Sequence, residues 1–296
     1  MRSVLAPALA LLLVAGPVMA AGDDEAIARG KYVYDAADCA GCHGGARDGG
    51  APAGGRGLAT PFGEFYPPNI SADVTNGIGG WSDAEFREAL RHGIAPGGKQ
   101  LFPVFPFASF SGMTDQDASD VRAYILTLPT STEASKPHAV RAPFGWRPLM
   151  GIWRALFFRP GPIQAQPERG EQWNRGNYLV HAVVHCEECH TPRNFMGALK
   201  ASRAFSGNIG GPDGQNAPNI TSDVESGIGS WSIEEIVHLL KTGETPDFDS
   251  VASGMAGVVR GTKKLTDADR HAIAVYLKSV PAIHTVRPPP KPPGQS

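Results

Sequence analysis

The residues best suited to chemistry are four cysteines that form two close pairs, each followed directly by a histidine. The first group is residues 39–43 (CAGCH), and the second is residues 186–190 (CEECH). C-x-x-C-H is the pattern of covalent c-type haem attachment, because two thiols at this spacing can add to the two vinyl groups of one haem. The next residue, histidine, supplies a neutral imidazole as the proximal iron ligand. The predicted attachment residues are Cys39, Cys42, Cys186 and Cys189, and the predicted proximal ligands are His43 and His190.

Two other chemistries use paired cysteines. Four cysteines in an exported protein often form two disulfides, but a redox-active C-x-x-C pair belongs near a βαβ pattern, which this sequence lacks. Zinc sites built from two such pairs usually have about 15–20 residues between them, whereas Cys186 follows Cys39 by about 150 residues. The spacing therefore favours two covalently bound haem c groups over a thiol or zinc module.

The second axial ligand separates an electron carrier from a haem enzyme. Met113 is the only methionine between His43 and Met150, and it lies in a loop after an apolar stretch. For the second haem the candidate is Met255, in a Gly-rich loop, because Met196 follows His190 too closely to reach the opposite face. A methionine ligand raises the potential, although both residues could instead fill gaps in a core. The other candidates are His92, His138, His238, His271 and His284.

Several other residues are candidates for contacts with the propionate groups of a haem. Trp81 and Trp231 are expected either to anchor a helix in the core or to donate to a propionate. Asn69 and Asn219 are expected to form turns. Arg193 is expected to pair with a propionate or to remain exposed.

The chain also contains an internal repeat. Residues 68–70 (PNI) recur at 218–220, and residues 77–79 (GIG) recur at 227–229. Upstream and downstream of these segments the offset changes by a few residues, as small loop insertions would produce. We call the two parts the first copy and the second copy, and we expect each to be one haem domain.

Each copy has the periodicity of helices, and no sustained alternating strand is present. Residues 23–37 are expected to form a helix that leads into the first C-x-x-C-H group. His181 and His185 lie in the corresponding helix of the second copy and are expected to pack or hydrogen-bond locally. Ser82–Glu85 and Ser232–Glu235 are capping boxes. Thr114 and Thr266 are expected to cap the last helix of each copy, which Pro129 and Pro281 end.

The predicted organisation begins with a secretory signal peptide, because Arg2 precedes an apolar run that is too short to span a bilayer. We therefore expect a periplasmic protein. The expected segments are a signal peptide (1–20), cytochrome c domain 1 (21–140), a linker (141–170), cytochrome c domain 2 (171–283) and a disordered proline-rich tail (284–296).

Charge excludes one class of partner and suggests another. A formal net charge of −2 argues against nucleic acid as a partner. Residues 144–159 are rich in aromatic side chains and arginine and contain no acid. This segment could lie on a membrane surface or bind an acidic partner, or its aromatic side chains could be buried between the two domains, which we favour.

The motifs together resemble a known family. Residues 173–180 (WNRGNYLV), 191–194 (TPRN) and 101–107 (LFPVFPF), with the repeated PNI and GIG segments, are similar to cytochrome c subunits of periplasmic alcohol and gluconate dehydrogenases. The resemblance implies an all-α fold with two tandem class I-like cytochrome c domains, joined here by the aromatic and basic linker. It also implies covalent haem c with His/Met ligation. Such subunits usually carry three haem motifs, whereas this chain has two. They often have methionine at the position of Phe105. If that methionine is their iron ligand, Met113 must substitute or the first haem lacks a sulfur ligand.

The function expected from these features is transfer of single electrons from a periplasmic dehydrogenase to a downstream cytochrome or terminal oxidase. On this reading the chain is not itself an enzyme. The alternative is a peroxidase-like dihaem enzyme, in which one haem has an open site and an acid/base residue above it.

Overall fold

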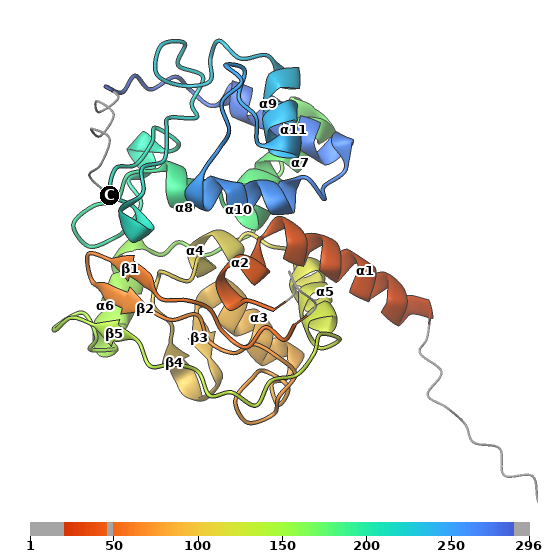
Figure 1. Cartoon of the computed structure of the whole chain (residues 1–296), viewed down its shortest axis with the longest axis vertical. Helices are drawn as coiled ribbons and strands as arrows, with labels where there is room; N and C mark the ends of the chain where they lie inside the picture. Colours follow the sequence, from red (N-terminus) through yellow and green to blue (C-terminus); the bar gives the residue numbers. More distant parts are fainter. Residues whose placement is uncertain (1–20, 46–49, 287–296) are drawn as a thin grey trace, which may run out of the picture.

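A computed structural model describes residues 21–45 and 50–286 of the chain. The predicted signal peptide and residues 287–296 of the predicted tail lie outside the described residues. Figure 1 shows the first copy in the lower half of the molecule and the second copy in the upper half. Most of the regular structure is helical, as expected.

The helices occur in the same order in both copies. In the first copy they are α1 (Ala21–Ala36), α2 (Cys39–His43), α3 (Asp83–His92), α4 (Phe107–Phe110) and α5 (Asp115–Ile125). In the second copy they are α7 (Gly170–Tyr178), α8 (Glu187–His190), α9 (Ile233–Thr242), α10 (Ser253–Thr262) and α11 (Asp267–Ser279). Between the copies lies α6 (Pro148–Phe157). A π-helical segment (Leu179–Val183) continues α7, and short 3₁₀ turns cover Pro96–Gly98, Pro167–Arg169, Ala201–Arg203 and Pro212–Gly214.

The predicted helix starts are present. In both capping boxes the serine accepts from the backbone N–H three residues later, and the glutamate accepts from the serine N–H. Thr114 and Thr266 cap α5 and α11 in the same way, through the N–H groups of Asp117 and Asp269. These caps satisfy N–H groups that a helix leaves without a partner in its first turn.

Two glycines bring the first and last helices of each copy into close contact. A Cβ atom at Gly30 of α1 would lie 1.8 Å from the carbonyl oxygen of Asp120 in α5. At Gly176 of α7 it would lie 2.0 Å from the carbonyl oxygen of Ala272 in α11. Only glycine permits backbones to approach this closely. The crossings fix where α1 and α7 end, and therefore where each C-x-x-C-H group begins.

The fold is mostly helical, as expected, and the described loops add five very short strands that the sequence did not indicate. β1 (Leu58–Thr60) pairs antiparallel with β2 (Gly63–Phe65), which pairs with β5 (Ala139–Val140). β3 (Ile94–Ala95) pairs with β4 (Lys99–Gln100). Strands of two or three residues are too short to produce a detectable alternation in the sequence.

The two copies interlock through tyrosines at matching positions. The Tyr32 hydroxyl of α1 donates to the Asp269 carboxylate at 2.7 Å and accepts from the backbone N–H of Thr266 at 3.0 Å. The Tyr178 hydroxyl of α7 makes the reciprocal contacts, with the Asp117 carboxylate and the backbone N–H of Thr114. Each tyrosine thus joins one copy to the N-terminus of the other copy's last helix.

Helix α6 has one buried face and one exposed face. Trp153 and Phe158 are buried against Phe107 of the first copy and Ala198 of the second. The indole N–H of Trp153 also donates to the carbonyl of Met196 at 3.0 Å. These two aromatic residues therefore lie between the copies, as favoured from the sequence.

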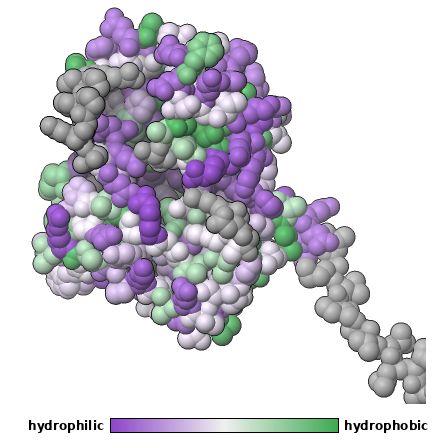
Figure 2. Space-filling view, viewed as in Figure 1, coloured by the Kyte–Doolittle hydropathy of each residue, from purple (hydrophilic) through white to green (hydrophobic). Residues whose placement is uncertain are grey.

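The outer side of α6 retains large apolar groups at the surface. Ile152 and Leu156 are each 55% exposed, and Trp146, just before the helix, is 63% exposed. Within the described part of the chain, no helix is long and apolar enough to cross a bilayer. On the face in Figure 2, hydrophobic residues form small separate groups among hydrophilic ones.

The reciprocal tyrosine contacts predict a cost for losing one hydroxyl. Tyr32→Phe removes two hydrogen bonds, one of them to a carboxylate, and should lower the free energy of unfolding of the haem-loaded protein by about 1–3 kcal/mol. Denaturant unfolding measures this change. Tyr124→Phe is the control, because its ring packs edge-on against Tyr34 but its hydroxyl has no hydrogen bond to another described residue. Equal losses in the two variants would contradict the proposed role of the Tyr32 contacts.

Candidate haem-attachment sites

Both motif histidines are held by the same hydrogen bond. Nδ1 of His43 lies 2.8 Å from the carbonyl oxygen of Pro68, and Nδ1 of His190 lies 2.8 Å from the carbonyl oxygen of Pro218. A carbonyl can only accept, so Nδ1 carries the proton and donates. Nε2 is then the unprotonated nitrogen, which is the atom needed to bind iron.

The surroundings keep these groups neutral. Burial lowers the pKa of His43 and of His190, although the Pro68 and Pro218 carbonyls partly oppose the change. Burial also raises the pKa of Cys39, and it raises the pKa of Cys186 to about 12. At neutral pH the sites therefore present neutral imidazoles and protonated thiols.

Glycine loops wrap closely around both motifs. The N–H of Gly54 donates to the His43 carbonyl at 3.0 Å, and the N–H of Gly207 donates to the His190 carbonyl at 2.8 Å. Both glycines have positive φ angles, of 117° and 90°. A Cβ atom at Gly55 would lie 1.7 Å from the Cys42 carbonyl oxygen. The loops thus form a tight backbone collar behind each histidine.

The residue before each motif adopts the same uncommon conformation. Asp38 has φ 47° and His185 has φ 48°, both left-handed. The second copy contains one more residue than the first between its crossing glycine and its first cysteine. The π-helical segment accommodates this residue, as a π-bulge does. The insertion therefore lies in a helix rather than in a loop, and the geometry at the motif is restored.

The two histidines near the second motif have different roles. His181 contacts its own copy, through the Tyr276 hydroxyl at 2.5 Å and the Glu187 carboxylate at 3.0 Å, so local bonding is confirmed. For His185 the expectation of local bonding is wrong, because its Nε2 lies 3.3 Å from the carbonyl oxygen of Ala37 in the other copy. His185 follows the end of the helix, and its left-handed backbone turns the side chain toward the first copy.

The two methionines lie in the core that both copies share. Met113 is 1% exposed and follows α4 in a loop, as expected. Met255 is partly buried, but it lies in the first turn of α10 rather than in a loop. Burial in a common core is compatible with iron ligation and with simple packing, so both remain predictions at this stage.

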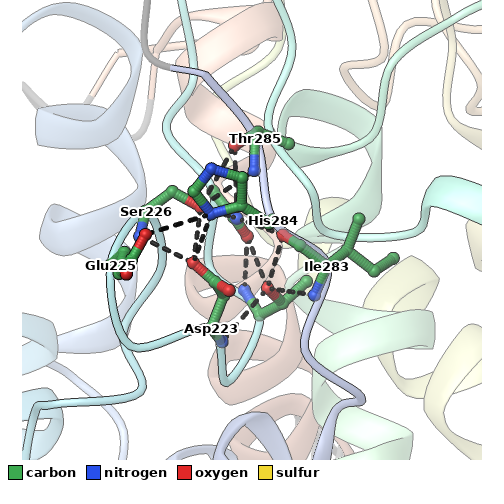
Figure 3. A network of polar contacts seen from close by, with 8 residues as sticks. Asp223, Glu225, Ser226, Ile283, His284 and Thr285 are labelled. Carbon is green, nitrogen blue, oxygen red and sulfur yellow. Dashed lines mark hydrogen bonds and ion pairs between the residues drawn. The ribbon is translucent and has the colours of Figure 1, made fainter.

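The alternative histidine ligands all have other partners. His92 contacts Glu88 at 2.7 Å, His238 contacts Glu244 at 3.1 Å, and His271 contacts Gln172 at 2.9 Å. His138 accepts from the backbone N–H of Tyr66 at 3.1 Å. His284 lies near the acidic side chains of Asp223 and Glu225 (Figure 3). These contacts leave the methionines as the better candidates.

Asn69 and Asn219 form turns, as expected. Their Oδ1 atoms accept from the N–H of Ser71 and of Thr221. Their Nδ2 atoms hold the chain that follows the last helix of each copy, at the carbonyls of Ser131 and Ile283. Figure 3 shows the second-copy network, in which Ile283 and Thr285 of that segment lie against the turn. The asparagines therefore support the prolines whose carbonyls hold the motif histidines.

Three ring groups have polar atoms suited to a bound haem. The indole N–H groups of Trp81 and Trp231 have no hydrogen-bond partner among the described residues, although both rings pack against the core. The Tyr34 hydroxyl, in a side chain that is 0% exposed, also has no partner there. Arg193, in contrast, is occupied by Glu188 at 2.5 Å. Together with the thiols and neutral imidazoles of the two motifs, these unpartnered donors fit a haem with its propionates.

Sequence reasoning missed Tyr34 and the proline carbonyls. The recurrence of Pro-Asn-Ile at a constant offset contained a signal for the carbonyls, since a repeated turn beside a repeated motif suggests a shared contact. Tyr34 gave no such signal, because its position in the second copy does not hold tyrosine.

Comparisons with known proteins agree with this chemistry. A sequence model of the cytochrome c family matches residues 27–129. The diheme cytochrome c-type protein of Cereibacter sphaeroides is 41% identical, over 96% of this chain and 100% of that protein. The fructose dehydrogenase cytochrome subunit of Gluconobacter japonicus is 40% identical over 90% of this chain, and the gluconate 2-dehydrogenase cytochrome c subunit of Pantoea cypripedii is 36% identical over 95% of it. The chain spans 55% and 66% of these two subunits.

The backbone collar predicts a difference between two glycines of one loop. Gly207→Ala and Gly210→Ala both place alanine at a positive φ, which costs about 1–2 kcal/mol. Only at Gly207 would the new methyl meet backbone, at 3.0 Å from the Asn219 nitrogen, whereas nothing lies within 4 Å at Gly210. Gly207→Ala should therefore give the lower thermal midpoint and the lower yield of covalent haem. If Gly210→Ala is equally damaging, the close approach at Gly207 is not what stabilises the motif.

Proposed function

The chain belongs to the cytochrome c family, and on that premise we propose that it is a periplasmic dihaem electron carrier with a haem c on each C-x-x-C-H group. The observation that carries the proposal is the pair of histidines with Nδ1 bound to a proline carbonyl, one in each copy. A bound haem supplies one-electron oxidation and reduction of its iron. The cysteines form the thioether links, and the carbonyl keeps Nε2 available as a ligand.

The tandem organisation is part of this proposal. Matching capping boxes, glycine crossings and glycine collars support two cytochrome c domains, 21–140 and 171–283, joined by the linker 141–170. The linker's buried aromatic residues lie between the two parts.

For the distal ligands we retain Met113 and Met255. Their burial in the shared core and the other contacts of the remaining histidines support a methionine sulfur as the second protein ligand that each site would offer to a bound haem. A His/Met pair favours a carrier, because the histidine and methionine would together hold the iron and leave no open site for a substrate.

The partner in this proposal is a periplasmic dehydrogenase that donates electrons, with a downstream cytochrome or terminal oxidase as acceptor. Relatives named as cytochrome subunits of fructose, alcohol and gluconate dehydrogenases support the donor. Such relatives are cytochrome rather than catalytic subunits, and the chain is likewise a carrier and not an enzyme.

The outer face of α6 supports peripheral association with a membrane. Ile152, Leu156 and the preceding Trp146 are exposed. Arg141 and Arg159, near the two ends of this segment in the sequence, are also exposed, and residues 144–159 contain no acid. Exposed apolar groups beside cationic side chains are suited to the interface of an anionic bilayer.

The haem content tests the central claim. The mature protein, made with the haem-attachment machinery, should be heavier than its polypeptide by two haem groups in intact mass spectrometry. Cys186→Ala with Cys189→Ala should remove one haem and leave the other. A mass equal to that of the bare polypeptide would refute the proposal and would favour a thiol or zinc module.

The ligand set predicts the effect of exchanging sulfur for nitrogen. Met255→His should keep both haems but lower one of the two midpoint potentials by more than ~59 mV, which is a tenfold change in a one-electron equilibrium. Spectroelectrochemical titration measures both midpoints, and the ferric sulfur-to-iron charge-transfer band should weaken.

Met150→Leu, a substitution of similar volume in another core cluster, should leave both midpoints unchanged. No shift in Met255→His would show that Met255 is not a ligand. A stable high-spin haem that binds peroxide or cyanide in the unmodified protein would instead favour the peroxidase-like alternative.

A further inference from the structure

His185 lies next to the second C-x-x-C-H motif and forms a hydrogen bond beside the first. It directly precedes Cys186, and its Nε2–H donates to the carbonyl of Ala37, which lies two residues before Cys39. Its ring also packs edge-on against Phe110 of the first copy, with centroids 5.3 Å apart. The imidazole thus contacts the first copy at two places. One is Ala37, beside the first C-x-x-C-H motif, and the other is Phe110, three residues before Met113.

These contacts define a route between Cys186 and Cys39 that consists of covalent bonds and one hydrogen bond. From Cys186 the route follows covalent bonds into the His185 side chain, crosses the 3.3 Å hydrogen bond to the Ala37 carbonyl, and follows the backbone to Cys39. It contains one non-covalent step. Electron tunnelling weakens less along covalent and hydrogen bonds than across van der Waals gaps, so a route with a single hydrogen bond is favourable.

The backbone of His185 is arranged for this contact. A left-handed φ of 48° is uncommon for residues other than glycine, asparagine and aspartate. It places the imidazole across the boundary between the copies, against Ala37 and Phe110 of the first copy. The π-helical insertion ends just before His185 and sets its position.

The reciprocal contact does not provide such a route. Asp38, the equivalent residue before Cys39, lies beside Gly257 of α10, where a Cβ atom would be 2.8 Å from the Asp38 Oδ2 atom. Asp38 therefore has the same backbone conformation and also contacts the opposite copy, but its contact at Gly257 lies far along the chain from Cys186.

We propose that His185 is a positioning residue for electron exchange between the two haems, acting through its hydrogen bond to the Ala37 carbonyl. This inference rests on the proposed function, because it requires one haem on each motif. One electron leaves the reduced haem and enters the oxidised one, and no proton or other reactant is needed.

The test compares His185→Gly with the unmodified haem-loaded protein. Glycine keeps the left-handed backbone and removes the ring. A pulse of reductant that delivers fewer than two electrons per molecule, followed by haem absorption, gives the rate at which the electron redistributes. We expect this rate to fall several-fold, while both midpoint potentials and the low-spin spectrum stay unchanged.

Asp38→Gly is the matched control, and its redistribution rate should equal that of the unmodified protein. His185→Asn, which also tolerates the left-handed backbone, replaces His185→Gly if glycine prevents folding. An unchanged rate in a two-haem His185 variant would overturn the inference, and so would an equal slowing in Asp38→Gly. An unmodified protein with fewer than two haems would contradict the proposed function instead, before either variant is measured.

Discussion

The orientation of two imidazole rings is the constraint on which the rest of the structure depends. A histidine can bind iron only through a nitrogen without a proton, and each motif histidine meets this requirement by donating Nδ1–H to a proline carbonyl. That carbonyl must itself be fixed. The following asparagine closes the turn and holds the segment after the last helix, so the ring orientation is linked to parts of the chain that lie far away in the sequence.

The helix that precedes each motif supplies the second part of this constraint. Gly30 and Gly176 let the first and last helices touch through their backbones, which sets the point where the chain must turn into the motif. The second copy reaches that point with one additional residue, and the π-helical segment accommodates it. The residue before the first cysteine has a left-handed backbone in both copies, although its identity differs. The route to the motif therefore varies while the geometry at the motif does not.

Sequence patterns could predict those parts of the fold that depend on near neighbours. The cysteine–histidine groups, the capping boxes and the turn asparagines are local signals with a physical cause, and each has the expected local structure. Contacts between the copies have no such signal. Tyr32 pairs with Asp269 across 237 residues, and His185 contacts Ala37 across 148 residues. The β-strands could not be predicted, because strands of two or three residues pair only where tertiary packing brings loops together.

The interlocking of the copies has a consequence for electron transfer. One continuous core contains residues of both copies, among them Val33 and Tyr34 of α1, and Leu179 and Val180 of the π-helical segment. The reciprocal tyrosines also join the two copies across this boundary, through hydrogen bonds to carboxylates. Two halves packed in this way cannot move independently without exposing a buried apolar surface, which is costly. The two C-x-x-C-H motifs are therefore held at a fixed separation, and a single hydrogen bond at His185 can remain formed, whereas a flexible tether between separate domains would make and break it continually.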